Sequence, residues 1–234
     1  MNKNSMTWIV MLVLSPLAAL LIAGCGSSGS ADMATYSVKV TNVSSNQPLS
    51  PTAVVFHNGS YSAWEIGAAV TDGLEVLAEG GDPSAFLAEA GTYSDVMATA
   101  AGMGAVGPGG SDTVTATVPK NTDLRVSVVT MLVNTNDAFT GVNGSAVGAL
   151  SVDDSITIYA NVYDAGTESN DESMGTVPGP AAGGEGFNAS RNDRDFATGH
   201  GGVVTADDGL AGSALNESHR FVGPVAKLTV TRTD

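Results

Sequence analysis

The chain has 234 residues, a formal net charge of −15 and a single cysteine. A surface this acidic repels the phosphates of nucleic acids and of anionic lipids, which excludes nucleic acid as a partner. One cysteine excludes an internal disulfide, so the fold has to be held by its core, with or without a metal ion.

The first 24 residues have the pattern of a lipoprotein signal peptide. Lys3 is the only charge before an apolar run from Trp8 to Ile22, and two small residues then precede Cys25. A transmembrane helix is the alternative, but the run is shorter than the ~20 residues that a span needs, and Pro16 interrupts it. We therefore predict that Cys25 becomes the lipidated first residue of the mature chain.

Residues 25–34 then comprise the lipidated cysteine and a flexible tether, because glycine and serine fill the stretch from Gly26 to Ser30. The position after Cys25 carries no aspartate that could act as a retention signal. We therefore expect a lipid anchor in the cell envelope, at the outer membrane. Residues 35–234 are long enough for one domain with a sizeable core.

The mature chain reads as an all-β protein. Apolar and polar residues alternate, or apolar residues run together, over 36–41, 52–57, 114–118, 124–133, 156–162 and 225–232. These strands predict an antiparallel β-sandwich.

One helical insertion interrupts the strands. From Ala63 to Leu77 the apolar residues fall at helical spacing, and Asp82-Pro83 predicts a short second helix that ends at Gly91. The glycine-rich run 102–110 lacks a phosphate-loop pattern and is predicted to be a connection. The polar region 181–202 is expected to have no core of its own.

Four carboxylates crowd into the loop after the strand at 156–162, and they belong to Asp164, Glu168, Asp171 and Glu172. No basic residue lies among them, and prolines close the segment. Carboxylates this close repel one another unless they spread into solvent or share a cation, and an oxygen-rich loop suits calcium. We predict that this loop is the functional end.

A second acidic position follows the strand at 124–133, at Asp137. Both strands run into their acidic residues at the C-terminal end. If the strands have the same orientation, Asp137 and Asp164 converge at one rim of the sandwich.

Several short motifs resemble those of one family. They are Tyr-Ser-Val-Lys-Val-Thr-Asn at 36–42, Asn-Gln-Pro-Leu-Ser-Pro at 46–51, Leu-Ala-Glu at 77–79, Met-Leu-Val-Asn-Thr-Asn-Asp-Ala-Phe at 131–139, Tyr-Asp-Ala-Gly-Thr-Glu at 163–168 and Val-Pro-Gly-Pro at 177–180. Their order and spacing are similar to those of the spondin N-terminal domain, along nearly the whole mature chain. The resemblance implies a β-sandwich related to C2 domains, with a calcium site at one end and a role in extracellular adhesion or matrix contacts.

The resemblance also implies calcium ligands. By position, the family's metal-binding aspartates fall on Asp137 and Asp164. Animal members take a third acidic ligand from the strand before the one that begins at Leu124, where this chain offers Thr115 and Thr117. Glu168 or water would then complete the set.

Three classes of function remain at this point. The leading one is a lipid-anchored, extracytoplasmic, calcium-binding module for adhesion or protein contact, without enzymatic turnover, whose ligand is an extracellular protein or glycan. A carbohydrate-binding sandwich would need exposed aromatic residues, and these make up 6% of the chain. A metal-assisted hydrolase would need an open metal position beside a base.

Overall fold

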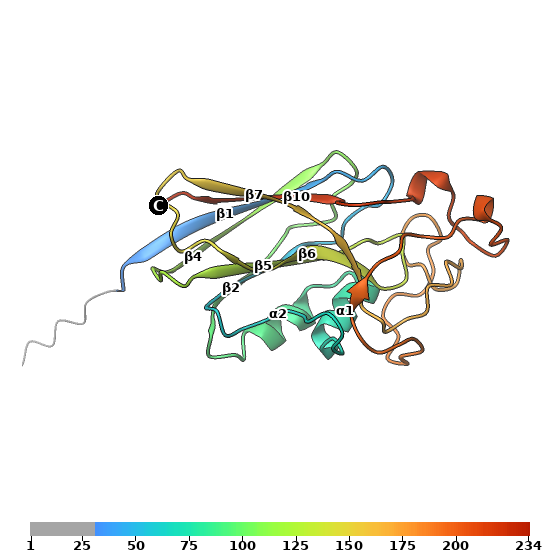
Figure 1. The fold of residues 1–234 in the computed structure, drawn as a ribbon, viewed down its shortest axis with the longest axis horizontal. Helices are drawn as coiled ribbons and strands as arrows, with labels where there is room; N and C mark the ends of the chain where they lie inside the picture. Colours follow the sequence, from blue (N-terminus) through green and yellow to red (C-terminus); the bar gives the residue numbers. More distant parts are fainter. Residues whose placement is uncertain (1–30) are drawn as a thin grey trace, which may run out of the picture. The chain divides into compact units, whose positions relative to one another are not determined.

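Two antiparallel β-sheets face each other in residues 31–234, the part of the chain that this computed structural model describes (Figure 1). The smaller sheet has the order β4 (Ser111–Pro119), β1 (Met33–Asn42), β10 (Ala226–Arg232) and β7 (Ser155–Ala160). The larger sheet has the order β3 (Val96–Ala101), β2 (Ala53–His57), β5 (Arg125–Met131), β6 (Ala138–Ala146), β8 (Val162–Asp164) and β9 (Thr198–Gly199). The predicted all-β sandwich is confirmed.

The signal peptide, Cys25 and the tether up to Ser30 lie outside the described residues. Residues 31–234 pack as one unit. No helix within this unit has the length and hydropathy that a membrane crossing requires.

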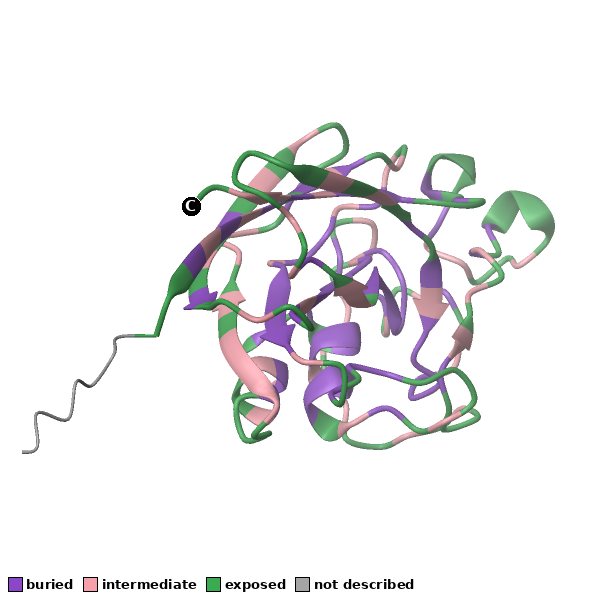
Figure 2. Ribbon diagram, turned by 60° about the vertical axis from the view of Figure 1, so that its left-hand side comes forward, coloured by how far each residue is buried: buried purple, intermediate pink, exposed green. Residues whose placement is uncertain are grey.

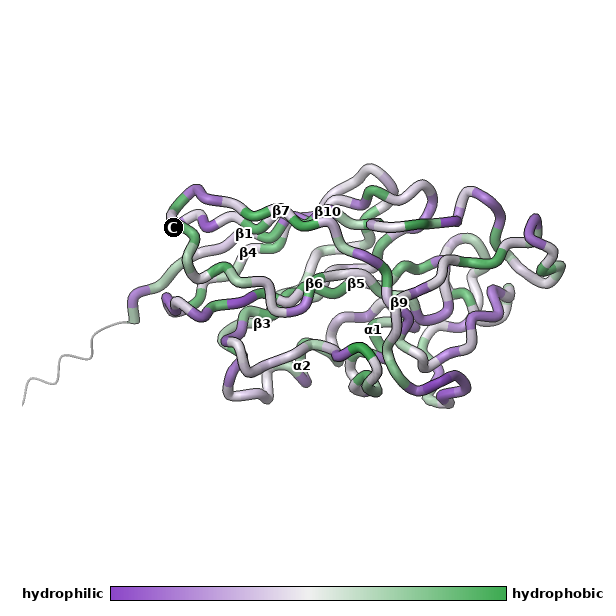
Figure 3. The backbone as a smooth tube through the Cα atoms, viewed as in Figure 1, coloured by the Kyte–Doolittle hydropathy of each residue, from purple (hydrophilic) through white to green (hydrophobic). Residues whose placement is uncertain are grey.

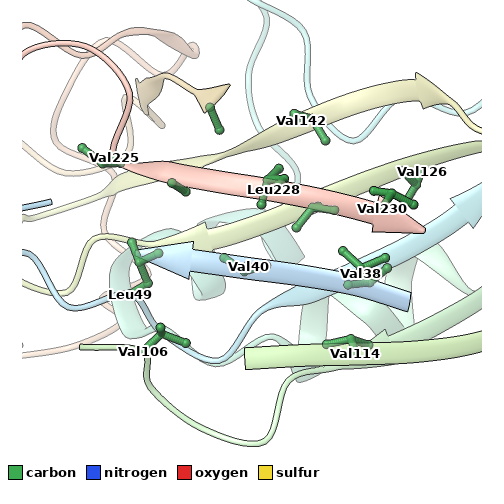
Figure 4. Close-up of a cluster of buried hydrophobic side chains, with 14 of the residues drawn as sticks. Val38, Val40, Leu49, Val106, Val114, Val126, Val142, Val225, Leu228 and Val230 are labelled. Carbon is green, nitrogen blue, oxygen red and sulfur yellow. The ribbon is translucent and has the colours of Figure 1, made fainter. Parts of the chain in front are cut away.

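The main core lies between the sheets and follows from the alternation of the outer strands. On β1, Val38 and Val40 are buried, and on the neighbouring β10 so are Leu228 and Val230. Figure 4 shows these side chains pointing toward Val126 and Val142 of the larger sheet. Successive residues of a strand point to opposite faces, so the residues between them form the polar outer face.

Two short helices, α1 (Asp72–Gly80) and α2 (Ser84–Ala90), cover the outer face of the larger sheet. Leu74 and Leu77 of α1 and Phe86 of α2 form a second apolar cluster with residues of that sheet. Because both faces of the larger sheet are covered, all five residues of β2 are buried. Figure 2 shows the contrast with the smaller sheet, where buried and exposed residues alternate.

The first helix begins later than the sequence predicts. Residues 63–71 are not helical, because Gly67 has a left-handed backbone with a φ of 87°. Ile66, expected on the apolar face of the helix, is more than half exposed. The helix begins after Thr71, whose hydroxyl accepts a hydrogen bond from the Leu74 N–H as an N-cap does. The prediction of a helical segment from Ala63 was therefore wrong in its first nine residues.

The predicted strand at 156–162 is two strands in different sheets. β7 pairs with β10 in the smaller sheet, and β8 pairs with β6 in the larger one. The chain crosses between the sheets at Asn161, whose carbonyl accepts a hydrogen bond from the Thr140 hydroxyl. The acidic loop therefore leaves from the larger sheet.

The sandwich has two different ends. β1 begins near the C-terminus, at one end, while the loops after β5 and β8 lie at the other (Figure 1). Figure 3 shows runs of hydrophilic residues in these loops. Within 181–202 the regular structure is limited to the two residues of β9.

Candidate functional site

Asp137 and Asp164 meet at the loop end of the larger sheet. β6 lies between β5 and β8 and is antiparallel to both, so β5 and β8 point the same way. Asp137 directly precedes β6, and the first residue of β6, Ala138, is the register partner of Asp164. The expected convergence of the two aspartates is therefore confirmed.

The carboxylate of Asp137 is fully buried and only half satisfied. Its Oδ2 accepts hydrogen bonds from the backbone N–H groups of Thr167 and Glu168, at 2.8 and 3.1 Å, while Oδ1 has no partner. Burial, with a further contribution from the charge of Asp164, raises the pKa of Asp137 to about 7. An ionised carboxylate is thus costly here without a cation.

In contrast to Asp137, Asp164 accepts hydrogen bonds with both of its carboxylate oxygens. Its Oδ1 accepts a hydrogen bond from the N–H of Gly166 at 2.8 Å. Its Oδ2 accepts hydrogen bonds from the amide of Asn170 at 2.7 Å and from the guanidinium of Arg194 at 2.9 Å. The buried charge of Asp164 is therefore balanced by the chain itself.

Glu168 is the third predicted ligand and lies 9% exposed in the loop after β8. Its Oε2 is buried without a hydrogen-bond partner. Burial, with further contributions from the nearby carboxylates of Glu79 and Asp137, raises the pKa of Glu168 to about 7. The carboxylates of Glu168 and Asp137 therefore both lack a counter-charge.

Glu79 belongs to the same surroundings, although sequence reasoning did not place it at the site. It lies in the last turn of α1 and is 1% exposed. Its Oε2 accepts a hydrogen bond from the N–H of Asn188 at 2.9 Å, and its Oε1 has no partner. The signal in the sequence is a glutamate beside the apolar stripe of the helix, at the position after Leu77 and Ala78.

The other two acids of the loop do not join these groups. Asp171 Oδ1 accepts hydrogen bonds from the Ser173 N–H and the Thr176 hydroxyl, within its own turn. Glu172 is buried, and its Oε1 accepts a hydrogen bond from the N–H of Val204 at 3.0 Å. Asp171 and Glu172 therefore have protein contacts of their own, apart from the predicted ligands.

Comparison with protein families decides what this sandwich is. The profile described as Spondin_N matches residues 39–176, which is more than half of the chain. The chain belongs to the spondin N-terminal domain family. No curated protein matches it significantly.

The part of this spondin domain that matches the family holds Glu79, Asp137, Asp164 and Glu168. Arg194 lies beyond it, in a segment that runs along the acidic loop. There the N–H of Asn192 donates a hydrogen bond to the Thr167 carbonyl at 3.0 Å. The counter-charge of Asp164 thus comes from outside the matched region.

Gly166 makes the turn in the acidic loop of the spondin domain possible. Its φ is 73°, and a Cβ there would collide with the carbonyl oxygen of Phe196. Gly183 has a φ of 72° but open space around its Cα. The two glycines thus share a left-handed backbone and differ in crowding.

Gly166→Ala should therefore destabilise the domain more than Gly183→Ala. Each substitution should lower the free energy of unfolding by about 1 to 2 kcal/mol, because alanine disfavours the left-handed backbone. Only Gly166→Ala should also displace the 188–197 segment. Urea unfolding of the two variants measures the difference. Equal losses of stability would show that Phe196 does not confine the loop.

The predicted trio of Asp137, Asp164 and Glu168 fits a hard cation in its chemistry but is not preassembled. Within residues 31–234, no group of three or more histidine, cysteine, aspartate or glutamate side chains is arranged to hold a metal ion. Two of the three predicted ligands nonetheless carry a buried oxygen without a partner, which is the kind of atom that a calcium ion satisfies. Binding therefore requires side chains to rotate toward a common centre.

Proposed function

We propose that this chain is a lipid-anchored, extracytoplasmic contact module whose acidic end binds calcium. The observation that carries the proposal is the pair of buried carboxylates of Asp137 and Glu168, each with one oxygen that has no hydrogen-bond partner. The two residues are neighbours, because the N–H of Glu168 donates a hydrogen bond to Asp137 Oδ2. Membership of the spondin N-terminal domain family supports the role in extracellular contacts. This family is not known for enzymatic activity.

The roles of the three predicted ligands differ. Asp137 and Glu168 would supply free oxygens, and a bound calcium ion would contribute the positive charge that their buried carboxylates lack. Asp164 already has Arg194 as its partner, so its oxygens can reach an ion only if that ion pair loosens. A cation that binds only the folded arrangement would stiffen the loop end, where a partner could dock.

The anchor belongs to the same proposal. β1 begins at the end of the sandwich remote from the acidic loop, so a tether that precedes Met33 does not need to cover that loop. The lipid would hold the module at the outer membrane, and the ligand would be an extracellular protein or glycan.

Cys25→Ser should release the protein from the membrane fraction, because acylation needs the thiol. Fractionation of cells that express the wild type and the variant, with mass spectrometry of the N-terminal peptide, checks this. A wild type that is already free of membranes and carries no lipid would refute the anchor.

The contact role is tested with residues 31–234 as bait for envelope proteins and glycans, with calcium or with chelator. Asp137→Asn serves as the matched bait. The proposal expects partners that the wild type retains in calcium and releases in chelator, and that the variant never retains. Partners held equally by both baits in both buffers would contradict a calcium-dependent contact.

The alternatives have less support. A carbohydrate site stacks sugars on exposed aromatic rings, but Trp64, the one tryptophan after the signal peptide, is 8% exposed. Its ring packs against Phe139 and Tyr163 at 5.2 and 5.3 Å between centroids. A hydrolase needs a metal open to substrate, and Asp137 is fully buried.

A further inference from the structure

One carboxylate at the acidic end comes from the helical layer and not from the loops. Glu79 ends α1, and its side chain is buried with Oε1 unpaired. Its Oε2 accepts a hydrogen bond from the N–H of Asn188. Oε1 is therefore available for a ligand without loss of that bond.

Glu79 lies at the same turn as the predicted ligands. The segment 188–192 joins them, because the N–H of Asn188 donates a hydrogen bond to Glu79 Oε2 and the N–H of Asn192 donates one to the Thr167 carbonyl. The Thr167 hydroxyl in turn donates a hydrogen bond to Asp137 Oδ2. The charge of Glu79 also helps to raise the pKa of Glu168. Three separate segments thus bring buried carboxylates to the turn of Thr167 and Glu168. In each carboxylate one oxygen has no partner: Glu79 Oε1, Asp137 Oδ1 and Glu168 Oε2.

Glu75, the preceding glutamate of α1, is buried but has a counter-charge. It lies one turn before Glu79, and its Oε2 accepts hydrogen bonds from Arg191 at 2.9 and 2.6 Å. Within residues 31–234, Glu79 forms no such ion pair. Burial of an ionised, unpaired carboxylate is costly, and a cation shared with the two neighbouring carboxylates would offset that cost.

The two threonines that the sequence offers as further ligands lie elsewhere. Thr115 and Thr117 belong to β4 in the smaller sheet, on its polar outer face, where Thr117 shares a hydrogen bond with Thr35.

We propose that Glu79 is a further calcium ligand, so that the ion joins helix α1 to the loops after β5 and β8. This rests on the calcium site proposed above. Calcium takes six to eight oxygen ligands, and the number of charged ligands tunes its affinity. Glu79, Asp137 and Glu168 would provide three of these charges, while Asp164 stays with Arg194.

Isothermal titration of calcium into residues 31–234 tests the assignment by comparing wild type, Glu79→Gln and Glu172→Gln. Glu172 is a close control, because it is also 1% exposed, accepts one hydrogen bond from a backbone N–H and has one unpaired oxygen. Both variants lose one formal charge. We expect Glu79→Gln to weaken calcium binding at least tenfold and Glu172→Gln to change it less than threefold.

The outcomes separate the two proposals. If the wild type binds calcium and Glu79→Gln binds within threefold of it, Glu79 is not a ligand and the site in the loops stands. If the wild type binds no calcium, both proposals fail. Should Glu79→Gln not fold, Glu79→Asp keeps the charge and shortens the reach by one methylene, and unchanged affinity in that variant would overturn the assignment.

Discussion

In calcium-free buffer, Asp137→Asn should stabilise the domain strongly at pH 8 and have little effect at pH 4. The wild-type carboxyl has its pKa raised from 3.8 to about 7, first by burial and then by the charge of Asp164. A raised pKa means that the folded state prefers the protonated form. The stability that this preference provides is complete below the unfolded pKa and is lost as the pH rises through about 7.

The size of the effect follows from the shift. At ~1.4 kcal/mol for each pH unit, the wild type should lose roughly 4 kcal/mol between pH 4 and pH 8 through this one group. Asparagine has the shape of the neutral acid and does not ionise, so the variant should escape that loss. For a domain of this size the gain at pH 8 amounts to about 10 °C in Tm.

Thermal melting of both proteins in chelator at several pH values measures the difference. Histidine and other acid titrations occur in both proteins, so they cancel when the two curves are subtracted. A wild-type minus variant difference that is flat from pH 4 to pH 8 would show that the buried Asp137 is not held in its neutral form.

Calcium should narrow the difference in stability between the wild type and Asp137→Asn. At pH 8 the ion would stabilise the wild type by about 2.7 kcal/mol when its concentration is one hundred times Kd, because it binds the folded state alone. With part of the coordination left to water, we expect a Kd of about 0.1 to 1 mM, the range of extracellular modules. Asp137→Asn, more stable in chelator, should gain nothing from calcium.

Asp164→Asn is the informative companion to that experiment. It removes the partner of Arg194 and leaves the guanidinium, which is 47% exposed, without its buried carboxylate. We expect a lower Tm in chelator together with a reduced calcium response. Melting curves of both variants that keep the full wild-type response to calcium would mean that neither aspartate takes part in a calcium site.

The sequence predicts best those parts of the fold in which one face meets solvent. β1, β4 and β10 have polar outer faces, and their alternation places them correctly. β6 is not among the strands predicted from the sequence, because Gly141 and Gly144 interrupt its alternation. In fact Gly141 lies opposite Val129 of β5, and a Cβ there would collide with the Val128 carbonyl. The requirement comes from the neighbouring strand, which local spacing does not reveal.

Some features of the candidate site can likewise be predicted from the sequence, and others cannot. Asp137 and Asp164 lie close together because β5 and β8 point the same way. This could be anticipated from the sequence, since each aspartate follows the C-terminal end of a predicted strand. The contacts of Arg194 and Glu79 do not, because each depends on a segment far along the chain that folds back over the loop. Which carboxylates are balanced and which lack a counter-charge is therefore visible only in the folded domain.

A calcium titration of residues 31–234 by calorimetry at pH 7.5 tests the central claim most directly. The account predicts one calcium ion bound per domain, with a Kd of about 0.1 to 1 mM, and no binding to Asp137→Asn. Heat of binding that is absent from the wild type, or equal in the wild type and Asp137→Asn, would contradict it.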